Sequence, residues 1–287
     1  NVGKLIDLQQ YNYVIRDNAA KRDAFVTSIV AFVKDKGYDG VDVDFEALEV
    51  GDRSSYKAFV KELRTALDKE FGARARLLTM AVQGERLSRY GLDDADIKVR
   101  DLVDYVSLMG YDYNVGGGNS PADPLGPWQN PNGLSVLQHL DQLANTHKVT
   151  PKKIVCLLPF YFRYKLPSGA AGSLSWHDLA PALSATGAAE RDAVKNKCVD
   201  PSYLEKRISI TYQGQTTNVW ATDPSCVYLR ARAALWGTQD AIPGRSYGGV
   251  GAWKVTQDYN GELSGALWQA TSGQEFSGGW NHRLCSQ

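Results

Sequence analysis

Hydrophobic and polar positions follow a helical period in two segments near the start of the chain. In segment 18–37, apolar residues recur every three or four positions, as on one face of a helix. Gly37 then supplies the left-handed backbone that ends many helices at little cost. Segment 54–72 shows the same period and also stops at a glycine. The predicted apolar faces are Phe25, Ile29, Phe32 and Val33 in the first helix, and Tyr56, Phe59, Val60, Leu63 and Leu67 in the second.

Short apolar runs rich in β-branched and aromatic side chains separate these and later helical segments. Runs of this kind are typical of buried strands. Strands that alternate with helices favour a parallel sheet covered on both faces, either closed as a barrel or open and doubly wound. The expected strands lie in 37–48, 76–82, 104–112, 152–161 and 247–255, and one of the helices between them lies at 133–147.

The barrel is the favoured form of this α/β fold. A doubly wound nucleotide-binding sheet usually carries a glycine-rich first turn, and the sequence has none. Segment 162–246 interrupts the alternation and is too long for an ordinary loop. It contains a predicted hairpin followed by a more helical stretch. We therefore expect a TIM (β/α)8-type barrel built from segments 1–161 and 247–287, with an α+β insertion between its last two strands.

The composition and charge of the chain limit which classes of binding partner the sequence supports. Lys plus Arg and Asp plus Glu number 32 each in the 287 residues, so charge gives no argument for binding nucleic acid or an anionic membrane. No apolar run approaches the roughly 20 residues that span a bilayer. The sequence shows no phosphate-binding glycine loop and no metal-ligand spacing around its four histidines. We expect no cofactor and no metal.

The cysteines and the first residue bear on the compartment. Cys198 and Cys226 flank one irregular segment and are candidates for a disulfide, whereas Cys156 lies in an apolar run typical of a buried thiol. The chain starts at Asn1 without a charged and then apolar leader, which indicates a processed or recombinant chain.

Four acids interrupt a stretch that otherwise reads as a buried strand. The stretch "GYDGVDVDFEAL" contains Asp39, Asp42, Asp44 and Glu46. Side chains alternate along a strand, so the last three acids share one face and the apolar residues between them share the other. In a barrel the apolar set packs outward on helices and the acids point inward near the mouth. A solvated edge strand is the alternative, which the usual burial of parallel strands disfavours.

Crowded carboxylates have a chemical use. Repulsion between like charges raises at least one pKa, so that a carboxyl group stays protonated near neutral pH and acts as a general acid. Glu46, the outermost acid with the longest reach, is the expected proton donor. Tyr111, Asp112 and Trp253 also sit at the ends of expected strands, where the chemistry of a barrel collects.

The acidic stretch resembles a known family. "DGVDVDFE" matches the D-x-x-D-x-D-x-E signature of glycoside hydrolase family 18, the chitinases and their relatives. The segments "LLTMAV", "SLMGYDYN", "CLLPFYFR" and "GGVGAWKVTQD" are similar, in order, to the fifth to eighth barrel strands of that family. The resemblance covers about residues 20–260 and is strongest to the bacterial branch that includes chitinases and spore-cortex glucosaminidases.

The resemblance implies a role for each residue. It makes Glu46 the donor to the leaving glycosidic oxygen and Asp44 the residue that orients the substrate's 2-acetamido group, whose carbonyl attacks the anomeric carbon. Asp42 shares a proton or hydrogen bond with Asp44, and Asp39 is structural. The remaining implied roles are Tyr111 donating to the acetamido group, Asp112 holding a sugar hydroxyl, Trp253 forming the pocket floor, and Met109 and Gln83 lining the pocket.

Several alternatives stay open at the level of sequence. Tyr111 is equally explained as an ordinary barrel tyrosine and Trp253 as a core residue. A family barrel has three strand–helix units before the acidic strand, and 38 residues precede Asp39. We therefore expect an N-terminally incomplete barrel, with "KLIDLQ" as a possible remnant strand, that another segment or chain completes.

The expected activity is retaining hydrolysis of β-1,4 bonds in chitin or chitooligosaccharides by a secreted chitinase. One alternative keeps the mechanism and changes the substrate to peptidoglycan or the N-glycan core. Another is a chitinase-like lectin, which the presence of Glu46 disfavours because such relatives usually lose the acid.

Overall fold

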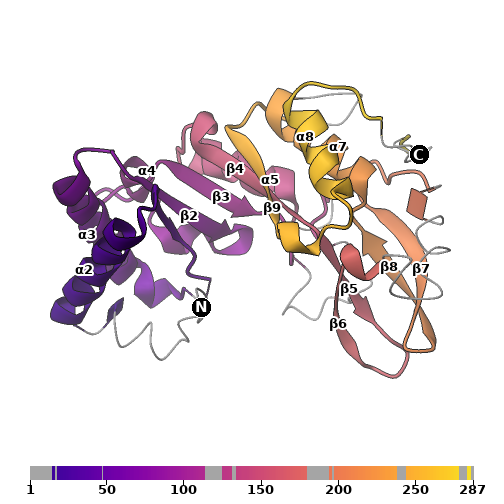
Figure 1. Cartoon of the computed structure of the whole chain (residues 1–287), viewed down its shortest axis with the longest axis horizontal. Coiled ribbons are helices and arrows are strands. Elements are labelled where there is room, and N and C mark those ends of the chain that lie inside the picture. Colours follow the sequence, from indigo (N-terminus) through magenta and orange to yellow (C-terminus); the bar gives the residue numbers. More distant parts are fainter. Residues whose placement is uncertain are drawn as a thin grey trace. The chain divides into compact units, whose positions relative to one another are not determined.

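The structure is a computed structural model. It describes residues 15–16, 18–46, 48–113, 125–130, 134–179, 194–195, 197–237, 244–277 and 283–285. Five strands form one sheet in the order β1-β2-β3-β4-β9, and two further pairs of strands form hairpins (Figure 1). The pairs β1–β2 and β4–β9 are parallel. The predicted α/β class, with strands that alternate with helices, is confirmed.

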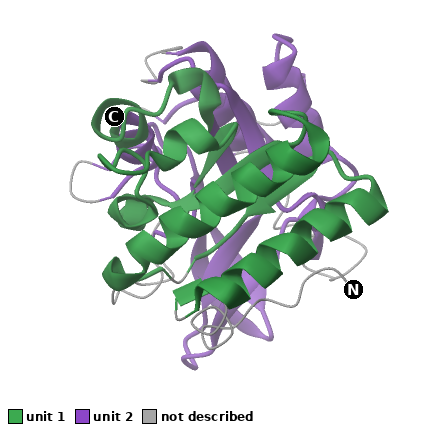
Figure 2. Ribbon diagram, turned by 90° about the vertical axis from the view of Figure 1, so that its left-hand side faces the viewer, with its two compact units in different colours: residues 1–108, 142–154 green, residues 109–141, 155–287 purple. Residues whose placement is uncertain are grey.

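Contacts divide the chain into two compact units (Figure 2). Unit 1 comprises residues 1–108 and 142–154, and unit 2 comprises residues 109–141 and 155–287. The possible remnant strand "KLIDLQ" lies outside the described residues.

Unit 1 contains the first predicted helices and strands. Its elements are α2 (Ala19–Lys36), β1 (Gly40–Val43), α3 (Arg53–Phe71), β2 (Leu77–Gln83), the 3-10 segment η3 (Gly84–Tyr90), α4 (Val99–Leu102) and most of β3 (Tyr105–Met109). The side chain of Asn18 accepts hydrogen bonds from two backbone N–H groups at the start of α2, and Gly37 (φ 67°) ends the helix, as its left-handed backbone predicts.

The apolar face was predicted correctly for α3 and only in part for α2, where Val33 is buried as predicted. All five predicted residues of α3 are buried. In α2 the buried residues are Val26 and Val33, whereas Phe32 is 45% exposed. The two helices contact each other through the stacked rings of Phe25 and Phe59, whose centroids lie 5.9 Å apart.

Unit 2 contains the insertion and the last strand. Its elements are α5 (Val136–Asp141), β4 (Ile154–Pro159), β5 (Tyr161–Lys165), β6 (Ala171–Ser175), β7 (Lys206–Tyr212), β8 (Gln215–Ala221), α7 (Pro224–Trp236), β9 (Gly249–Trp253) and α8 (Glu262–Thr271). The antiparallel hairpins β5–β6 and β7–β8 and the helix α7 fill the interval between β4 and β9. The predicted α+β insertion is confirmed.

The predicted disulfide is wrong. Cys198 pairs with Cys285, 87 residues later, and Cys226 is a free thiol. The reason lies in the local structure. Cys226 is in the first turn of α7 and fully buried, whereas Val199 forms a β-bridge with Leu284 that brings Cys198 beside Cys285. Cys156 is a buried free thiol, as predicted.

None of the helices within the described ranges is both long enough and apolar enough to cross a membrane.

Candidate active site

The acids of unit 1 lie at the carboxyl end of β1. The strand ends at Val43, so Asp42 is inside it while Asp44 and Glu46 follow it. The expected strand is therefore shorter than the alternation suggested. Phe45 packs on α3, with its ring centroid 5.5 Å from Phe59 and 6.1 Å from Tyr56. The apolar side of the stretch thus faces a helix as predicted, and the three acids remain solvent-exposed.

Asp44 is the acid whose pKa is raised. Its carboxyl group is partly desolvated, although the residue retains exposed surface, and this desolvation is the largest cause. The negative charges of Glu46 and Asp42 add to it, and together they raise the pKa of Asp44 to about 6. The predicted coupling among the carboxylates is therefore present, with Asp44 as its centre.

The other acids are held by neighbours on β2 and η3. The hydroxyl of Thr79 donates to Asp42 Oδ1. Gln83 Nε2 lies 3.4 Å from Glu46 Oε2, and Arg86 donates to the backbone carbonyl of Glu46 at 3.2 Å. Asp39 accepts a hydrogen bond from Leu77 N–H through its carbonyl (2.9 Å) while its side chain is exposed. Unit 1 thus brings together the predicted residues Asp42, Asp44, Glu46 and Gln83.

Tyr90 joins this group, which the sequence did not predict. Its hydroxyl accepts from Gln83 N–H (3.1 Å) and lies 3.5 Å from the carbonyl oxygen of Phe45, so it links the two backbone stretches that carry Glu46 and Gln83. Burial is the main cause that raises the pKa of Tyr90 to about 12, and the charges of Asp44 and Glu46 contribute. A neutral hydroxyl at this point keeps its ability to donate.

Asp112 anchors the second group of predicted residues, in unit 2. Its backbone is left-handed (φ 61°), a conformation that non-glycine residues adopt rarely and mainly where the surroundings impose it. Arg163 on β5 forms a two-pronged ion pair with Asp112, from Nε to Oδ1 at 2.9 Å and from one terminal nitrogen to Oδ2 at 2.8 Å. This geometry fixes the carboxylate in one plane.

Tyrosines surround Asp112. The Tyr161 hydroxyl is hydrogen-bonded to it, and burial, followed by the charge of Asp112, raises the Tyr161 pKa. The rings of Tyr161 and Tyr111 meet edge to face, with centroids 5.9 Å apart. Met109 and Tyr111 are buried, while Trp253 at the end of β9 is 50% exposed. An exposed tryptophan argues against the alternative that Trp253 is a core residue.

Arg163 and Tyr161 were not predicted from the sequence. The signal for them is the alternation in "FYFRYK" (160–165), which puts both on the same face of a strand directly after β4. Asp112, which both side chains contact, lies 51 positions before Arg163, and no local pattern identifies it.

The raised pKa of Asp44 predicts a pH-dependent stability. The pKa of an aspartate in the unfolded chain is near 3.9, and the pKa of Asp44 in the folded protein is about 6. At pH values between these two, the native state keeps the Asp44 proton while the unfolded chain loses it. Stability therefore falls as pH rises through this window, and above it the ionised carboxylate destabilises the fold. Asp44→Asn should be more stable than the wild type at pH 7.5 and equal to it at pH 4. Thermal unfolding at both values measures this, with Asp39→Asn as control. Equal differences at the two pH values would contradict it.

Comparisons with known proteins identify the family. Residues 2–258 match the Glycosyl hydrolases family 18. Chitotriosidase-1 from Mus musculus is 30% identical over 164 residues, covering 50% of this chain and 34% of the relative. Chitinase B from Serratia marcescens is 30% identical over 317 residues, covering 89% and 62%. The chain thus spans less than two thirds of the length of either relative.

Solved structures share the fold. A class V chitinase from Nicotiana tobaccum, in complex with NAG4, has a TM-score of 0.71 at 23% identity, covering 91% of this chain and 76% of that chain. A chitinase-like agglutinin from Robinia pseudoacacia has a TM-score of 0.70 at 20% identity over the same shares. With the family match over most of its residues and the acidic motif at the end of β1, the chain belongs to the glycosyl hydrolases of family 18.

Proposed function

We propose that this chain hydrolyses β-1,4 bonds beside N-acetylglucosamine, in chitin or chitooligosaccharides, with retention of anomeric configuration. The observation that carries the proposal is the coupled acid group at the end of β1, where Asp44 has a pKa of about 6 beside Glu46 and Asp42. Two relatives that are 30% identical over the aligned residues are named Chitotriosidase-1 and Chitinase B.

In the proposed mechanism the substrate supplies the nucleophile. Glu46 protonates the leaving oxygen while the 2-acetamido carbonyl attacks the anomeric carbon, as in the substrate-assisted exceptions to the two-carboxylate scheme. Asp44 holds the acetamido group and balances the positive charge that develops on it. Asp42 shares a proton with Asp44, and it is itself held by Thr79.

The residues of unit 2 take the binding roles in this proposal. Tyr111 donates its hydroxyl to the acetamido group, and the free lone pairs of Asp112, fixed by Arg163, accept a sugar hydroxyl. Trp253 offers its exposed ring face to the apolar face of a sugar. Met109 lines the sugar-binding side of this unit. In unit 1, Gln83 lines the acid group and Asp39 has a structural role through its backbone.

Product analysis tests the proposal. The purified chain is incubated with chitohexaose, cellohexaose and peptidoglycan glycan strands, and the products are followed by mass spectrometry and by NMR of the anomeric protons. Cleavage of chitohexaose with initial β-anomers is the expected result. Cleavage of glycan strands alone would assign a different substrate, inversion would exclude the acetamido nucleophile, and binding without cleavage would make the chain a lectin.

Trp253→Ala should weaken the binding of chitotetraose by about 1–3 kcal/mol, the usual effect of removing a large stacked apolar surface. Calorimetric titration measures this affinity. Trp268→Ala is the matched control, because Trp268 on α8 is similarly exposed (59%) and has no proposed contact with the substrate. An unchanged affinity in folded Trp253→Ala would show that Trp253 does not touch the sugar.

We also propose that the protein acts outside the cell. The Cys198–Cys285 disulfide is typical of oxidising compartments, and polymeric chitin is itself an extracellular substrate.

A further inference from the structure

The segment that contains Leu125 and Gly126 lies directly against the Tyr111–Asp112 backbone. Tyr113 N–H donates to Leu125 O at 3.1 Å. A Cβ atom at Gly126 would stand 2.1 Å from Gly110 O and 3.1 Å from Tyr111 Cα. Only glycine fits at such a distance, so the peptide that precedes Tyr111 is confined by the backbone of Gly126.

A buried carboxylate holds this segment in place. Glu205 Oε2 accepts from Leu125 N–H at 3.1 Å, and Oε1 accepts from Gly126 N–H at 3.0 Å. Arg230 on α7 donates to the same Oε1 at 2.8 Å, and both Glu205 and Arg230 are fully buried. A carboxylate without solvent keeps its charge only when such partners surround it, so its position is fixed.

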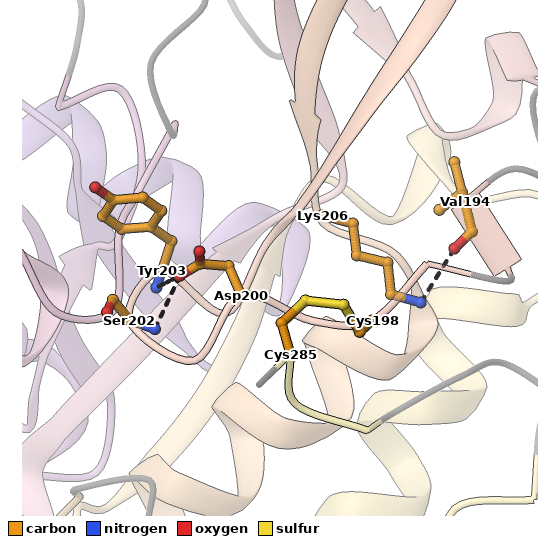
Figure 3. Close-up of a disulfide and its surroundings, with 7 residues drawn as sticks. All are labelled: Val194, Cys198, Asp200, Ser202, Tyr203, Lys206 and Cys285. Atoms are coloured by element: carbon orange, nitrogen blue, oxygen red, sulfur yellow. Dashed lines mark hydrogen bonds between the residues drawn. A yellow bond between two sulfur atoms is a disulfide. The ribbon is translucent and has the colours of Figure 1, made fainter. Parts of the chain in front are cut away.

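Glu205 follows a turn that the side chain of Asp200 closes through Ser202 and Tyr203 (Figure 3). Asp200 Oδ1 accepts from the backbone N–H groups of Ser202 and Tyr203, both at 2.9 Å, and Asp200 N–H donates to Glu205 O at 3.0 Å. The disulfide between Cys198 and Cys285 ties the start of this turn to the end of the chain.

The same turn makes two more contacts with the segment. Trp128 N–H donates to Tyr203 O at 3.0 Å, and Gln129 N–H donates to Ser202 O at 2.7 Å. Together with the two bonds to Glu205, these bonds seat four backbone N–H groups of 125–129 on one turn of the insertion. The turn at 200–205 therefore determines where the backbone of Gly126 contacts the peptide that precedes Tyr111.

We propose that Glu205 is a positioning residue for Tyr111 and that it acts through Gly126. This inference rests on the proposed function, in which Tyr111 donates to the acetamido group. A hydroxyl that is displaced by a fraction of an ångström donates poorly in the transition state, while the sugar still binds. The role of Glu205 is thus in turnover, and its carboxylate reaches the reaction only through the backbone of residues 110–113.

A second buried ion pair provides a matched control. Lys206, the next residue, pairs with Asp223 at 2.7 Å, and both are fully buried. The contacts of Asp223 with Lys206, Ser225 and Cys226 lie within β7 and α7. Asp223→Asn therefore removes a buried charge from the same unit without touching segment 125–129. A purely structural role for Glu205 predicts the same result for both variants.

Kinetic measurements on the whole chain distinguish a positioning role of Glu205 from a purely structural role. Glutamine at 205 keeps one acceptor oxygen but turns N–H groups toward at least one of the three donors, Leu125 N–H, Gly126 N–H and Arg230. Glu205→Gln should therefore lower kcat about tenfold or more with KM within about threefold. Gly126→Ala should do the same while leaving Glu205 itself unchanged, because the Cβ of alanine would displace the backbone at Gly110 and Tyr111. Asp223→Asn should lower the melting temperature and leave kcat within about twofold.

A double-mutant cycle with Tyr111→Phe tests whether the effect of Glu205 on turnover passes through Tyr111. If Glu205 acts through Tyr111, then Glu205→Gln should change kcat by no more than about twofold in the Tyr111→Phe background. A full, additive loss in that background would overturn the proposal, as would equal losses of kcat in Glu205→Gln and Asp223→Asn.

Hydrogen exchange gives a readout that needs no activity. The amides of Tyr113, Leu125 and Gly126 should exchange about tenfold faster in Glu205→Gln than in the wild type or in Asp223→Asn, because their acceptors are displaced. If the wild type cleaves no sugar, the proposed function fails while exchange still tests the contact. Unchanged exchange at these three amides in a folded Glu205→Gln protein would refute the positioning role whatever the activity.

Discussion

Glu46→Gln is expected to lower kcat for chitooligosaccharide hydrolysis by about 10²–10⁴-fold, the usual contribution of a general acid. Glutamine keeps the shape of the side chain and its contact with Gln83, but it has no proton to give to the leaving oxygen. The affinity for the oligomer should stay within a few fold, because the removed interaction exists only in the transition state. Turnover measured with chitotetraose, alongside calorimetric binding to the same oligomer, tests both parts.

Glu275→Gln is a suitable control for this variant, since Glu275 is exposed in unit 2 and has no proposed role. Turnover in Glu46→Gln close to that of the control would mean that another group donates the proton. A loss of binding equal to the loss of turnover would instead point to a structural role for Glu46 in unit 1.

The helical period of the apolar residues predicted the positions of the helices more accurately than it predicted which side of each helix is buried. In α3 the apolar residues form one stripe, and that stripe is buried. In α2 apolar residues occur around more than one side, so several stripes fit the same period. The core takes the side with Val26 and Val33 and leaves Phe32 exposed. Which side is covered depends on α3, a partner that the α2 segment does not encode.

The candidate site divides in the same way. The acids Asp42, Asp44 and Glu46 were predictable because they occupy every second position of one short stretch, a pattern that places their side chains on the same face. Arg163, which fixes Asp112, and Tyr90, which links the stretches of Glu46 and Gln83, belong to the site only through contacts between distant segments. The disulfide is a further case, since its partners lie 87 residues apart and meet through a β-bridge.

The raised pKa also shows what local sequence leaves undetermined. Repulsion within the acid group was predictable, and reach along the chain suggested Glu46 as the proton carrier. The group whose pKa rises to about 6 is Asp44, because desolvation, the largest cause, acts there in addition to the charges of Glu46 and Asp42. Spacing specifies which charges interact, and burial adds the desolvation that raises the pKa of Asp44.

Asp44→Asn is expected to lower kcat by about 10²–10³-fold, comparable to the loss of one electrostatic contact with a transition state. The reason differs from that for Glu46. Asparagine neither balances the positive charge that develops on the acetamido group nor exchanges a proton with Asp42. The variant should also bind a stable cyclic mimic of the oxazolinium intermediate more weakly than the wild type, because that mimic carries the charge that Asp44 faces.

Two further measurements decide whether the substrate supplies the nucleophile. Cellulose oligomers, which lack the acetamido group, should not be cleaved by the wild type even at an intact acid group. A 2-fluoro sugar should leave the protein unlabelled, because no enzyme carboxylate attacks the anomeric carbon. Covalent labelling of Asp44 or Glu46 by that sugar, detected by mass spectrometry, would identify an enzyme nucleophile and exclude the substrate-assisted mechanism. Asp42→Asn should show an intermediate loss of kcat, since Asp44 then loses the carboxyl group with which it shares its proton in the proposed mechanism.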